Sequence, residues 1–436
     1  MTWPSSNTLI ATVTSAGLMA GVAASWATIT ATGEGKSGTP AIAVSNAPAG
    51  GHIYYTATTG LDINPGTLAS PFKTIAKGAS VLQPGDTLYI RGGTYAETLD
   101  NNIPSGTSWA SPVTVSAYPG ETVIVQPAAT LIVRFDNPAS YVVLANLILD
   151  GTKMTALNPC VYINNRYGTG NPNHIRFTGG EFRNCASNGL LIEASLASPT
   201  PDYNEIINVK VHDNGRLDPP NTKLPHHGLY IQSSHNLITG CDIYNNPGLG
   251  VHIYKDNAVN GVDASYNTVS NNKVHDNAKS GWRGHGIILS GGDRNVAYNN
   301  LIWNNQGGIQ VDYNASNTSV YNNTIYANNA NRGSAGIDLG SSVGARNTTI
   351  RNNIVYGNTA GDIKTGSATH TVADHNTLNA TNPLFVNAAS HDFHLMTGSP
   401  AIDAGLAVTG VATDFDGIHR PQGAGYDIGA YEYVQP

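Results

Sequence analysis

GLYIQSSHNLITGCDIYNNPGLGVHIY, residues 228–254, contains one complete unit of a pattern that repeats through the middle of the chain. It begins and ends with a Gly-led run, GLYIQ and GVHIY, and the run IYNN lies between them. Apolar residues alternate within each run, which is typical of a strand with one buried face. The stretch therefore predicts short strands separated by tight turns, with no helix between them.

The same two kinds of run recur on both sides of this stretch. The Asn-closed run appears as FRNC at 182, VHDN at 211 and 274, IWNN at 302, IYAN at 325 and VYGN at 355, and the Gly-led run appears as GLLIE at 189, GIILS at 286, GIQVD at 308 and GIDLG at 336. Asn tolerates the left-handed backbone of turns and can bond to stacked copies of itself. Repeats without helices predict one solenoid coil each. We therefore expect an all-β fold, a right-handed parallel β-helix.

The ends of such a stack need covers, because open strand edges bind other chains. The stretch SPFKTIAKGASVLQPGD, 70–86, predicts an N-terminal capping helix near 71–83, with Ser70 as its N-cap and Pro71 in the first helical position. The repeat rhythm fades after about residue 380. We expect three parts: an N-terminal assembly or leader segment with a linker at 1–51, the β-helix at 52–380 and a C-terminal cap at 381–436.

Charge and composition narrow the expected partners. The net charge is −7 and no basic run is present, so nucleic acid is not expected as a partner. Residues 8–31 carry no charge, and no Lys or Arg precedes them, so the segment lacks the positively charged region with which a secretory signal begins. Its Thr, Ser and Gly content argues against a transmembrane span. We interpret this segment as one through which copies of the chain could form a homo-oligomer.

The three cysteines are Cys160, Cys185 and Cys241. They are too few for a disulfide framework and lack the paired spacing of a structural zinc site. We interpret them as small buried residues of the repeat core. The redox compartment stays open at this point.

Three stretches resemble a known superfamily. YYTATTGLDINPGTLASPFKTIAKGASVLQPGDTLYIRGGTYAETL, 54–99, resembles the N-terminal cap of secreted bacterial right-handed β-helix proteins of the pectate-lyase-like superfamily, and GSPAIDAG and RPQGAGYDIGAYEY are similar to their ending. The resemblance covers roughly residues 52–436. It implies an extracellular or cell-surface protein. The superfamily includes polysaccharide lyases, glycoside hydrolases, uronan epimerases, phage tailspikes and adhesins, so the resemblance specifies fold more than function.

Stacked coils place equivalent outward residues in columns at the strand spacing of about 4.8 Å. One column lies two residues after the leading Gly and contains Leu191, Tyr230, His252, Ile288, Gln310 and Asp338. A second column lies four residues after that Gly and contains Glu193, Gln232, Tyr254, Ser290, Asp312 and Gly340. His227 and His285 directly precede two of the leading glycines, and Lys255, Trp282 and Arg283 lie between them. Long insertions at 194–204, 215–225 and 256–264 flank the same coils and are expected to wall a groove.

These residue types suit β-elimination from a uronic acid, or C5 epimerisation. Either reaction needs a cation for the carboxylate, a base for the C5 proton and an acid. Arg283 or Lys255 suits the first role. The candidate bases are His252, His227 and His285, and the candidate acids are Tyr230 and Tyr254. Trp282 is expected to stack on sugar rings, and Gln310, Asp312 and Asp338 to contact substrate.

Three alternatives stay open. A glycoside hydrolase needs two carboxylates about 5–9.5 Å apart, and Asp312 and Asp338 are the candidates. A non-catalytic glycan-binding adhesin or phage tail component would make the protein virion-associated or surface-bound. Pectate-type lyases often use calcium, so Ca²⁺ remains an option, but Asp256, Asp263 and Asp293 form no cluster that the sequence can assemble. No cofactor is assigned, and the expected partner is an acidic polysaccharide.

Overall fold

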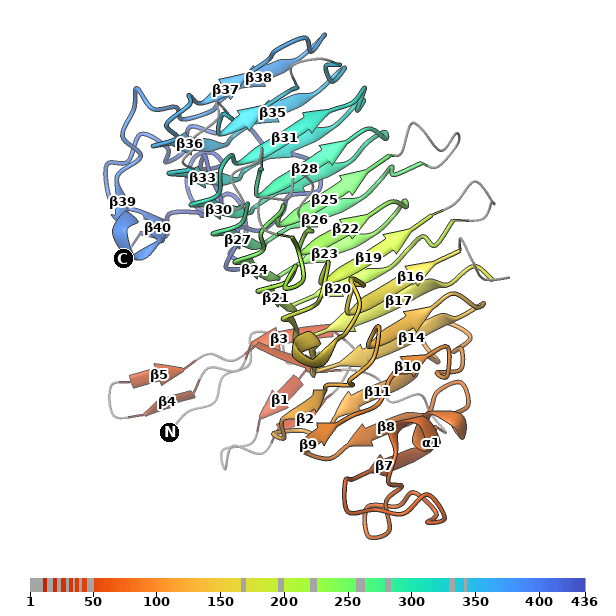
Figure 1. The fold of residues 1–436 in the computed structure, drawn as a ribbon. Coiled ribbons are helices and arrows are strands. Elements are labelled where there is room, and N and C mark those ends of the chain that lie inside the picture. Colours follow the sequence, from red (N-terminus) through yellow and green to blue (C-terminus); the bar gives the residue numbers. More distant parts are fainter. Residues whose placement is uncertain are drawn as a thin grey trace.

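The computed structural model describes residues 51–165, 170–194, 200–219, 226–255, 263–278, 284–328, 334–340 and 343–435, and six short strands before them. Most of the chain winds into a stack of coils (Figure 1). The described strands of these coils form three parallel sheets of ten, twelve and ten strands. The strands of one coil follow in the order first, second and third sheet. The predicted parallel β-helix is confirmed.

The first sheet carries the Gly-led runs. Its ten strands are β10 Leu99–Asp100, β13 Val133–Phe135, β16 Val161–Asn164, β19 Leu190–Glu193, β22 Leu229–Ile231, β25 Val251–Tyr254, β28 Ile287–Ser290, β31 Ile309–Asp312, β34 Ile337–Asp338 and β37 Ile363–Lys364.

In each coil, one turn joins the strand of the first sheet to the strand of the second sheet. Its twelve strands are β7 Ile53–Thr56, β8 Thr87–Ile90, β11 Val113–Ala117, β14 Ser140–Ala145, β17 Asn173–Thr178, β20 Glu205–Ile207, β23 Leu237–Thr239, β26 Thr268–Ser270, β29 Val296–Tyr298, β32 Ser319–Tyr321, β35 Thr349–Arg351 and β38 Val372–Asp374.

The third sheet carries the Asn-closed runs. Its ten strands are β9 Gly93–Tyr95, β12 Val123–Val125, β15 Leu147–Asp150, β18 Glu181–Arg183, β21 Lys210–His212, β24 Asp242–Tyr244, β27 Lys273–His275, β30 Leu301–Trp303, β33 Thr324–Tyr326 and β36 Ile354–Tyr356. A short 3-10 helix, η1 Gly151–Lys153, follows β15.

Buried aliphatic and Asn side chains hold the coils in register. Along the first sheet Ile192, Ile231 and Ile253 pair with one another and are fully buried. In the turn after the third sheet Asn246, Asn277 and Asn305 stack, and each side-chain oxygen accepts the backbone N–H of the Asn in the preceding coil at 2.9–3.3 Å. The expected role of Asn in the turns is therefore confirmed, because these side chains satisfy backbone groups that would otherwise be buried without partners.

The capping helix is shorter than the sequence suggested. Helix α1 spans Ile75–Ser80, and its N-cap is Thr74, whose hydroxyl accepts the Lys77 N–H at 3.1 Å. The expected N-cap at Ser70 is wrong, because Phe72 bonds through its backbone to β7 and so stays extended. Gly78 lets α1 approach the first coil, since a Cβ there would lie 2.6 Å from Leu88 Cδ1.

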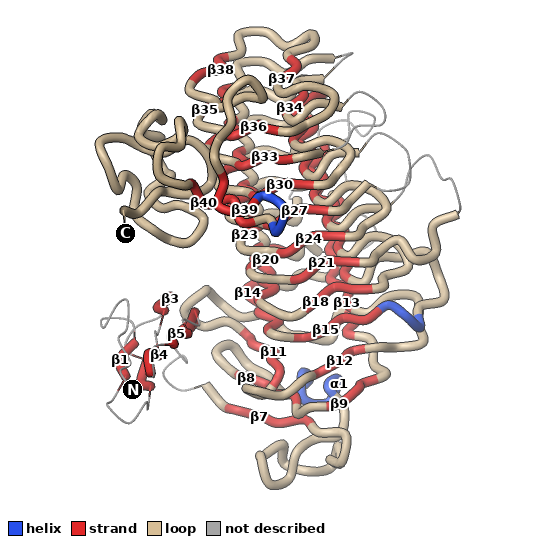
Figure 2. The backbone as a smooth tube through the Cα atoms, turned by 90° about the vertical axis from the view of Figure 1, so that its left-hand side faces the viewer, coloured by secondary structure: helices blue, strands red, loops and turns tan. Residues whose placement is uncertain are grey.

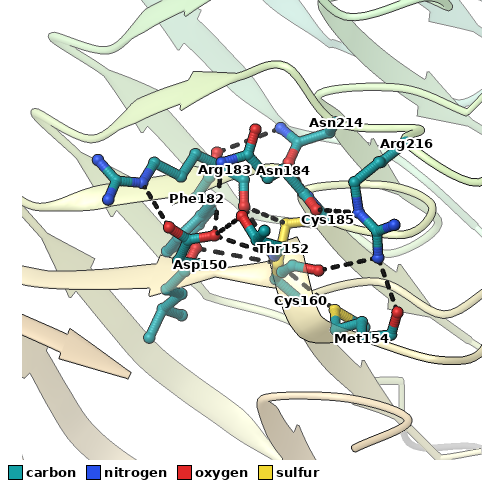
Figure 3. The surroundings of a disulfide bond; sticks show 12 residues. Asp150, Thr152, Met154, Cys160, Phe182, Arg183, Asn184, Cys185, Asn214 and Arg216 are labelled. Atoms are coloured by element: carbon teal, nitrogen blue, oxygen red, sulfur yellow. Dashed lines mark hydrogen bonds and ion pairs between the residues drawn. A yellow bond between two sulfur atoms is a disulfide. The ribbon is translucent and has the colours of Figure 1, made fainter. Parts of the chain in front are cut away.

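A disulfide joins two neighbouring coils. Cys160 and Cys185 are bonded, with their Cα atoms 5.3 Å apart, and Cys241 is free and buried (Figure 3). All three cysteines are buried in the core, as interpreted, but the bond between Cys160 and Cys185 was not expected. Stacking brings together residues that are 25 positions apart, which their spacing in the sequence did not reveal.

The C-terminal segment lies along the side of the coils (Figure 2). It contains β39 Phe385–Asn387, η2 Ala388–Ser390 and β40 Asp392–Leu395. Phe393 packs 5.3 Å from Tyr326 and 5.8 Å from Trp303, between ring centroids, so the segment covers outward side chains of the third sheet. We expected residues 381–436 to form a cap at the end of the stack. The outward aromatic residues of β30 and β33 provide an apolar surface for it at the side instead.

The N-terminal segment contains three antiparallel strand pairs. β1 Ala11–Val13 pairs with β2 Met19–Gly21, β3 Ser25–Thr28 with β6 Ala41–Val44, and β4 Ala31–Gly33 with β5 Lys36–Gly38. All six strands lie within residues 1–51, the part that was expected to be an assembly or leader segment and a linker. Among the described residues no helix is both long and apolar enough to span a membrane.

Candidate functional site

The outward columns have the register that the sequence predicted. In the first sheet Tyr230 pairs with His252, His252 with Ile288, and Gln310 with Asp338. The second column is formed in the same way, with Tyr254 beside Ser290 and Ser290 beside Asp312.

Four aromatic side chains meet on this face, and we call His227, Tyr230, His252 and Tyr254 the His–Tyr cluster. The rings of Tyr230 and His252 stack at 4.8 Å and 5°. His227 stands edge-on to both, with centroids 5.2 and 5.0 Å away, and Tyr254 lies 5.1 Å from His252. Alternation along β22 and β25 turns Tyr230 and His252 outward, while Leu229 and Val251 fill the core.

Hydrogen bonds fix the tautomers of the two histidines. The backbone N–H of Leu249 donates to Nδ1 of His227 at 3.1 Å, so the neutral ring of His227 carries its proton on Nε2. That nitrogen lies 3.2 Å from Nδ1 of His252, which must then be the acceptor. The proton of neutral His252 is therefore on Nε2, and this ring offers an N–H as a donor.

Burial keeps both rings neutral at ordinary pH. It lowers the pKa of His252 to about 3. It also lowers the pKa of His227 well below its ordinary value, and the neighbouring His252 and His226 lower it further. His252 is thus a poor proton acceptor, because its Nδ1 is occupied and its protonated form is strongly disfavoured. Its chemistry is that of a neutral donor.

Carboxylates gather two coils further along the same face. Asp312 is 8% exposed, and the hydroxyl of Ser290 donates to its Oδ1. Burial raises the pKa of Asp312 to about 6, against the hydrogen bond from Ser290, and the negative charge of Asp338 raises it further. Gln310 and Asp338 are half-buried neighbours on the outward column.

We expect the pKa of Asp312 to make stability fall as pH rises. Between about pH 4 and the folded pKa of about 6, the folded chain binds more protons than the unfolded chain, so the free energy of unfolding decreases with pH. Asp312→Asn should abolish this decline and stabilise the protein above pH 7 by up to about 3 kcal/mol. Thermal melting from pH 4 to 8 measures it. Asp338→Asn is the control. It removes the charge that raises the pKa of Asp312, so the decline in the free energy of unfolding should only move to lower pH. A wild-type curve without the decline would contradict the assignment.

The other residues that the sequence predicted for the site are not part of the His–Tyr cluster. Lys255 follows β25, and its Nζ is 3.9 Å from Oδ1 of Asp263. His285 is 2% exposed and packs on Gly307, where a Cβ would lie 2.4 Å from its ring. Trp282 and Arg283 lie outside the described residues. The structure thus brings together His227, Tyr230, His252 and Tyr254, and places Gln310, Asp312 and Asp338 further along the same face. Their roles remain predictions.

Two features were missed in the sequence. Asp218 holds the ring of His226, although this histidine belongs to the conspicuous pair HHG. Tyr203, His235 and Tyr266 stack at 4.6 and 4.8 Å in the turn before the second sheet. A signal for the stack was present, because each ring directly precedes a buried Asn of the turn.

The described carboxylates do not form a calcium site. Asp263 approaches Lys255, and Asp293 accepts from Ser316 at 2.9 Å and pairs with Arg294 at 2.7 Å. Within the described ranges no three His, Cys, Asp or Glu side chains could together hold a metal ion. Asp256 lies outside these ranges.

Comparisons with known proteins place the chain among β-helix proteins. Residues 54–222 match the family described as Pel9A-like, right handed beta helix region, and residues 195–378 match the family described as right handed beta helix region. Coils, columns and matches together define a right-handed parallel β-helix protein. Within this class, residues 54–222 are similar to the Pel9A-like β-helix region.

Three similar proteins illustrate the likeness. The crystal structure of pectate lyase Pel9A has a TM-score of 0.65 at 19% identity, covering 87% of this chain and 96% of that one. A rhamnogalacturonan lyase has a TM-score of 0.57 at 17% identity, covering 78% and 92%. Pectate lyase PEL9 of Emericella nidulans is 34% identical over 71 residues, which are 16% of this chain and 17% of that protein. The chain thus matches a fifth or less of its curated relatives' length.

Proposed function

We propose that the protein is a carbohydrate-active β-helix enzyme that cleaves an acidic polysaccharide by β-elimination or epimerises its uronic acids at C5. The observation that carries the proposal is the His227–His252 pair, which presents an N–H beside two tyrosines on an outward face. Lyases among similar proteins support the reaction class.

The reaction divides into steps that the cluster can serve. A base removes the proton from C5, and in elimination the C–H electron pair becomes the C4=C5 double bond while the C4–O bond breaks. The leaving oxygen takes a proton from a tyrosine. Gln232 donates to Oη of Tyr230 at 3.1 Å, which stabilises negative charge there as its proton leaves. In epimerisation C5 is reprotonated from the other side, and no bond to oxygen breaks.

We assign His252 a different role from that of base. Its Nε2–H can donate to the substrate carboxylate, where negative charge grows as C5 loses its proton. Lys255 and Arg283 are proposed as cations for the same carboxylate, and Trp282 as a sugar-stacking residue. Gln310, Asp312 and Asp338 are proposed to contact sugars further along the face.

A glycoside hydrolase is the second candidate. The observation that favours it is the pKa of Asp312, which is raised to about 6 beside Asp338, as suits a general acid paired with a carboxylate. This reaction would need no base at C5. It would release reducing ends without a double bond.

We propose an extracellular or cell-surface location. The Cys160–Cys185 disulfide supports it, because such bonds persist in oxidising compartments. Assembly through residues 1–51 into a homo-oligomer, and with it a virion-associated location, is the alternative proposal.

The test is absorbance near 235 nm, where the new C4=C5 bond absorbs, with the purified chain and a panel of uronic-acid polysaccharides. Each is assayed with added Ca²⁺ and with a chelator, and exchange of the C5 proton with deuterium in solvent is followed in parallel. Rising absorbance supports the lyase, and exchange alone supports the epimerase. Reducing ends without absorbance would favour the hydrolase. Glycan binding with no chemistry would overturn the enzyme in favour of a binding protein.

A further inference from the structure

Asp218 and His226 form a dyad at the entrance to β22. Oδ2 of Asp218 accepts the backbone N–H of His226 at 2.9 Å, and Oδ1 contacts Nδ1 of the His226 ring. The side chain of Asp218 is 7% exposed and that of His226 is 28% exposed. A buried carboxylate thus holds a ring that remains open to solvent on one side.

The dyad fixes the tautomer of His226. An ionised carboxylate only accepts hydrogen bonds, so Nδ1 of His226 carries the proton. Nε2 then has a lone pair, and no other residue in the described part of the chain bonds to it. The two adjacent histidines therefore differ. The Nδ1 lone pair of His227 accepts a hydrogen bond from the backbone N–H of Leu249, whereas His226 presents a lone pair on Nε2.

Asp218 is held by its chain neighbours. Gly215, Arg216 and Leu217 donate backbone hydrogen bonds to Ser187, Cys185 and Ala186 at 2.6–3.0 Å. Arg216 also donates to the carbonyl oxygens of Gly151 at 3.1 Å and Met154 at 2.7 Å, beside the disulfide (Figure 3). The turn that carries Asp218 is therefore tied to two coils, and the carboxylate is fixed before any substrate arrives.

The dyad adjoins the His–Tyr cluster. His226 directly precedes His227, whose ring contacts Tyr230 and His252. Their charges also interact, because His226 lowers the pKa of His227 and Asp218 raises it. His226, an oriented imidazole with an open lone pair, is therefore the sequence neighbour of His227, which contacts the donor His252.

We propose that His226, oriented by Asp218, is the proton acceptor of the candidate site. The inference rests on the proposed function. Nε2 of His226 takes the C5 proton, and the imidazolium is stabilised by Asp218. The C–H electron pair forms the C4=C5 bond, the C4–O bond breaks, and the leaving oxygen receives the tyrosine proton. The acid and the base are thus different residues: a tyrosine of the His–Tyr cluster and His226 of the adjoining dyad.

The experiment measures kcat and KM for elimination by wild type and variants. His226→Gln keeps a donor for Asp218 and should lower kcat about 10²-fold, while KM changes less than about threefold. His226→Ala should regain activity when imidazole is added, which a purely structural role would not produce. His235→Gln, in the exposed ring stack outside the cluster, is the matched control and should retain wild-type kcat.

A second measurement does not depend on turnover. Nitrogen NMR of the wild type should show His226 protonated on Nδ1, and Asp218→Asn should shift the proton to Nε2 because the amide can donate. The same variant should lose activity about as strongly as His226→Gln.

The outcomes separate the two proposals. A wild type that neither forms the double bond nor exchanges the C5 proton overturns the proposed function, and the dyad's role with it. An active wild type whose His226→Gln variant keeps its kcat overturns the dyad's role alone. So does a His226→Ala variant that is folded, inactive and not rescued by imidazole.

Discussion

Replacing His252 by alanine is expected to lower kcat for elimination by about 10²–10³-fold. The variant removes the N–H that the His227 pair directs outward, and this donor is most valuable when charge develops on the substrate. The donor is neutral at every pH at which the protein is assayed, since the pKa of His252 is lowered to about 3. The loss should therefore be similar from pH 6 to pH 9. Initial rates at 235 nm measure it.

The third sheet offers a matched control for this variant. His212 stacks on Tyr244 at 4.7 Å and 3°, almost the same arrangement as Tyr230 on His252, and also pairs across adjacent strands. His212→Ala should thus cost similar packing energy without reducing kcat. If both variants lose activity equally, the loss comes from weakened coils, and the role of His252 is refuted.

The fold was predictable because the same alternation of buried and outward residues recurs in the strands of every coil. Parallel neighbours in a solenoid are one repeat apart in sequence, so aligning the Gly-led runs also aligned Tyr230 with His252 and Gln310 with Asp338. Burial on one face of each strand made the alignment unambiguous.

Contacts that do not follow the repeat were not predictable. The Cys160–Cys185 bond joins different positions of two coils, and the C-terminal segment meets Trp303 and Tyr326 through a surface with no periodic signal. The start of α1 depended on the backbone of Phe72 pairing with β7. Each needs the three-dimensional course of the chain.

The site was only partly predictable for the same reason. Columns identified Tyr230, His252 and Tyr254, because an outward position in a strand is a property of sequence. The positions of the protons on the histidine rings cannot be derived from the sequence in this way. They depend on the backbone N–H of Leu249 for His227 and on the Asp218 carboxylate, eight positions away, for His226. The sequence thus located the cluster but gave its histidines interchangeable roles.

Asn277→Asp is expected to destabilise the chain by about 3–5 kcal/mol. Asn277 is 1% exposed, and its amide nitrogen donates to the carbonyl oxygens of Ile243 and His275 at 2.9 Å and to Oδ1 of Asn305 at 3.1 Å. A carboxylate of the same shape places an acceptor against these three acceptors. It must either bury an unpaired charge or take up a proton, and a single proton can restore only one of the three bonds.

An exposed Asn pair provides the control for this prediction. Asn347 donates to Oδ1 of Asn317 at 3.2 Å in solvent, and its left-handed backbone tolerates Asp as well as Asn. Asn347→Asp should change stability by less than about 0.5 kcal/mol. Urea denaturation followed by circular dichroism compares the two variants. Because coils of a solenoid depend on their neighbours, amide exchange should rise first around Asn246 and Asn305, which bond to Asn277 from either side. Equal effects of the two variants would contradict the prediction, because burial between coils would then add nothing to the cost of the substitution.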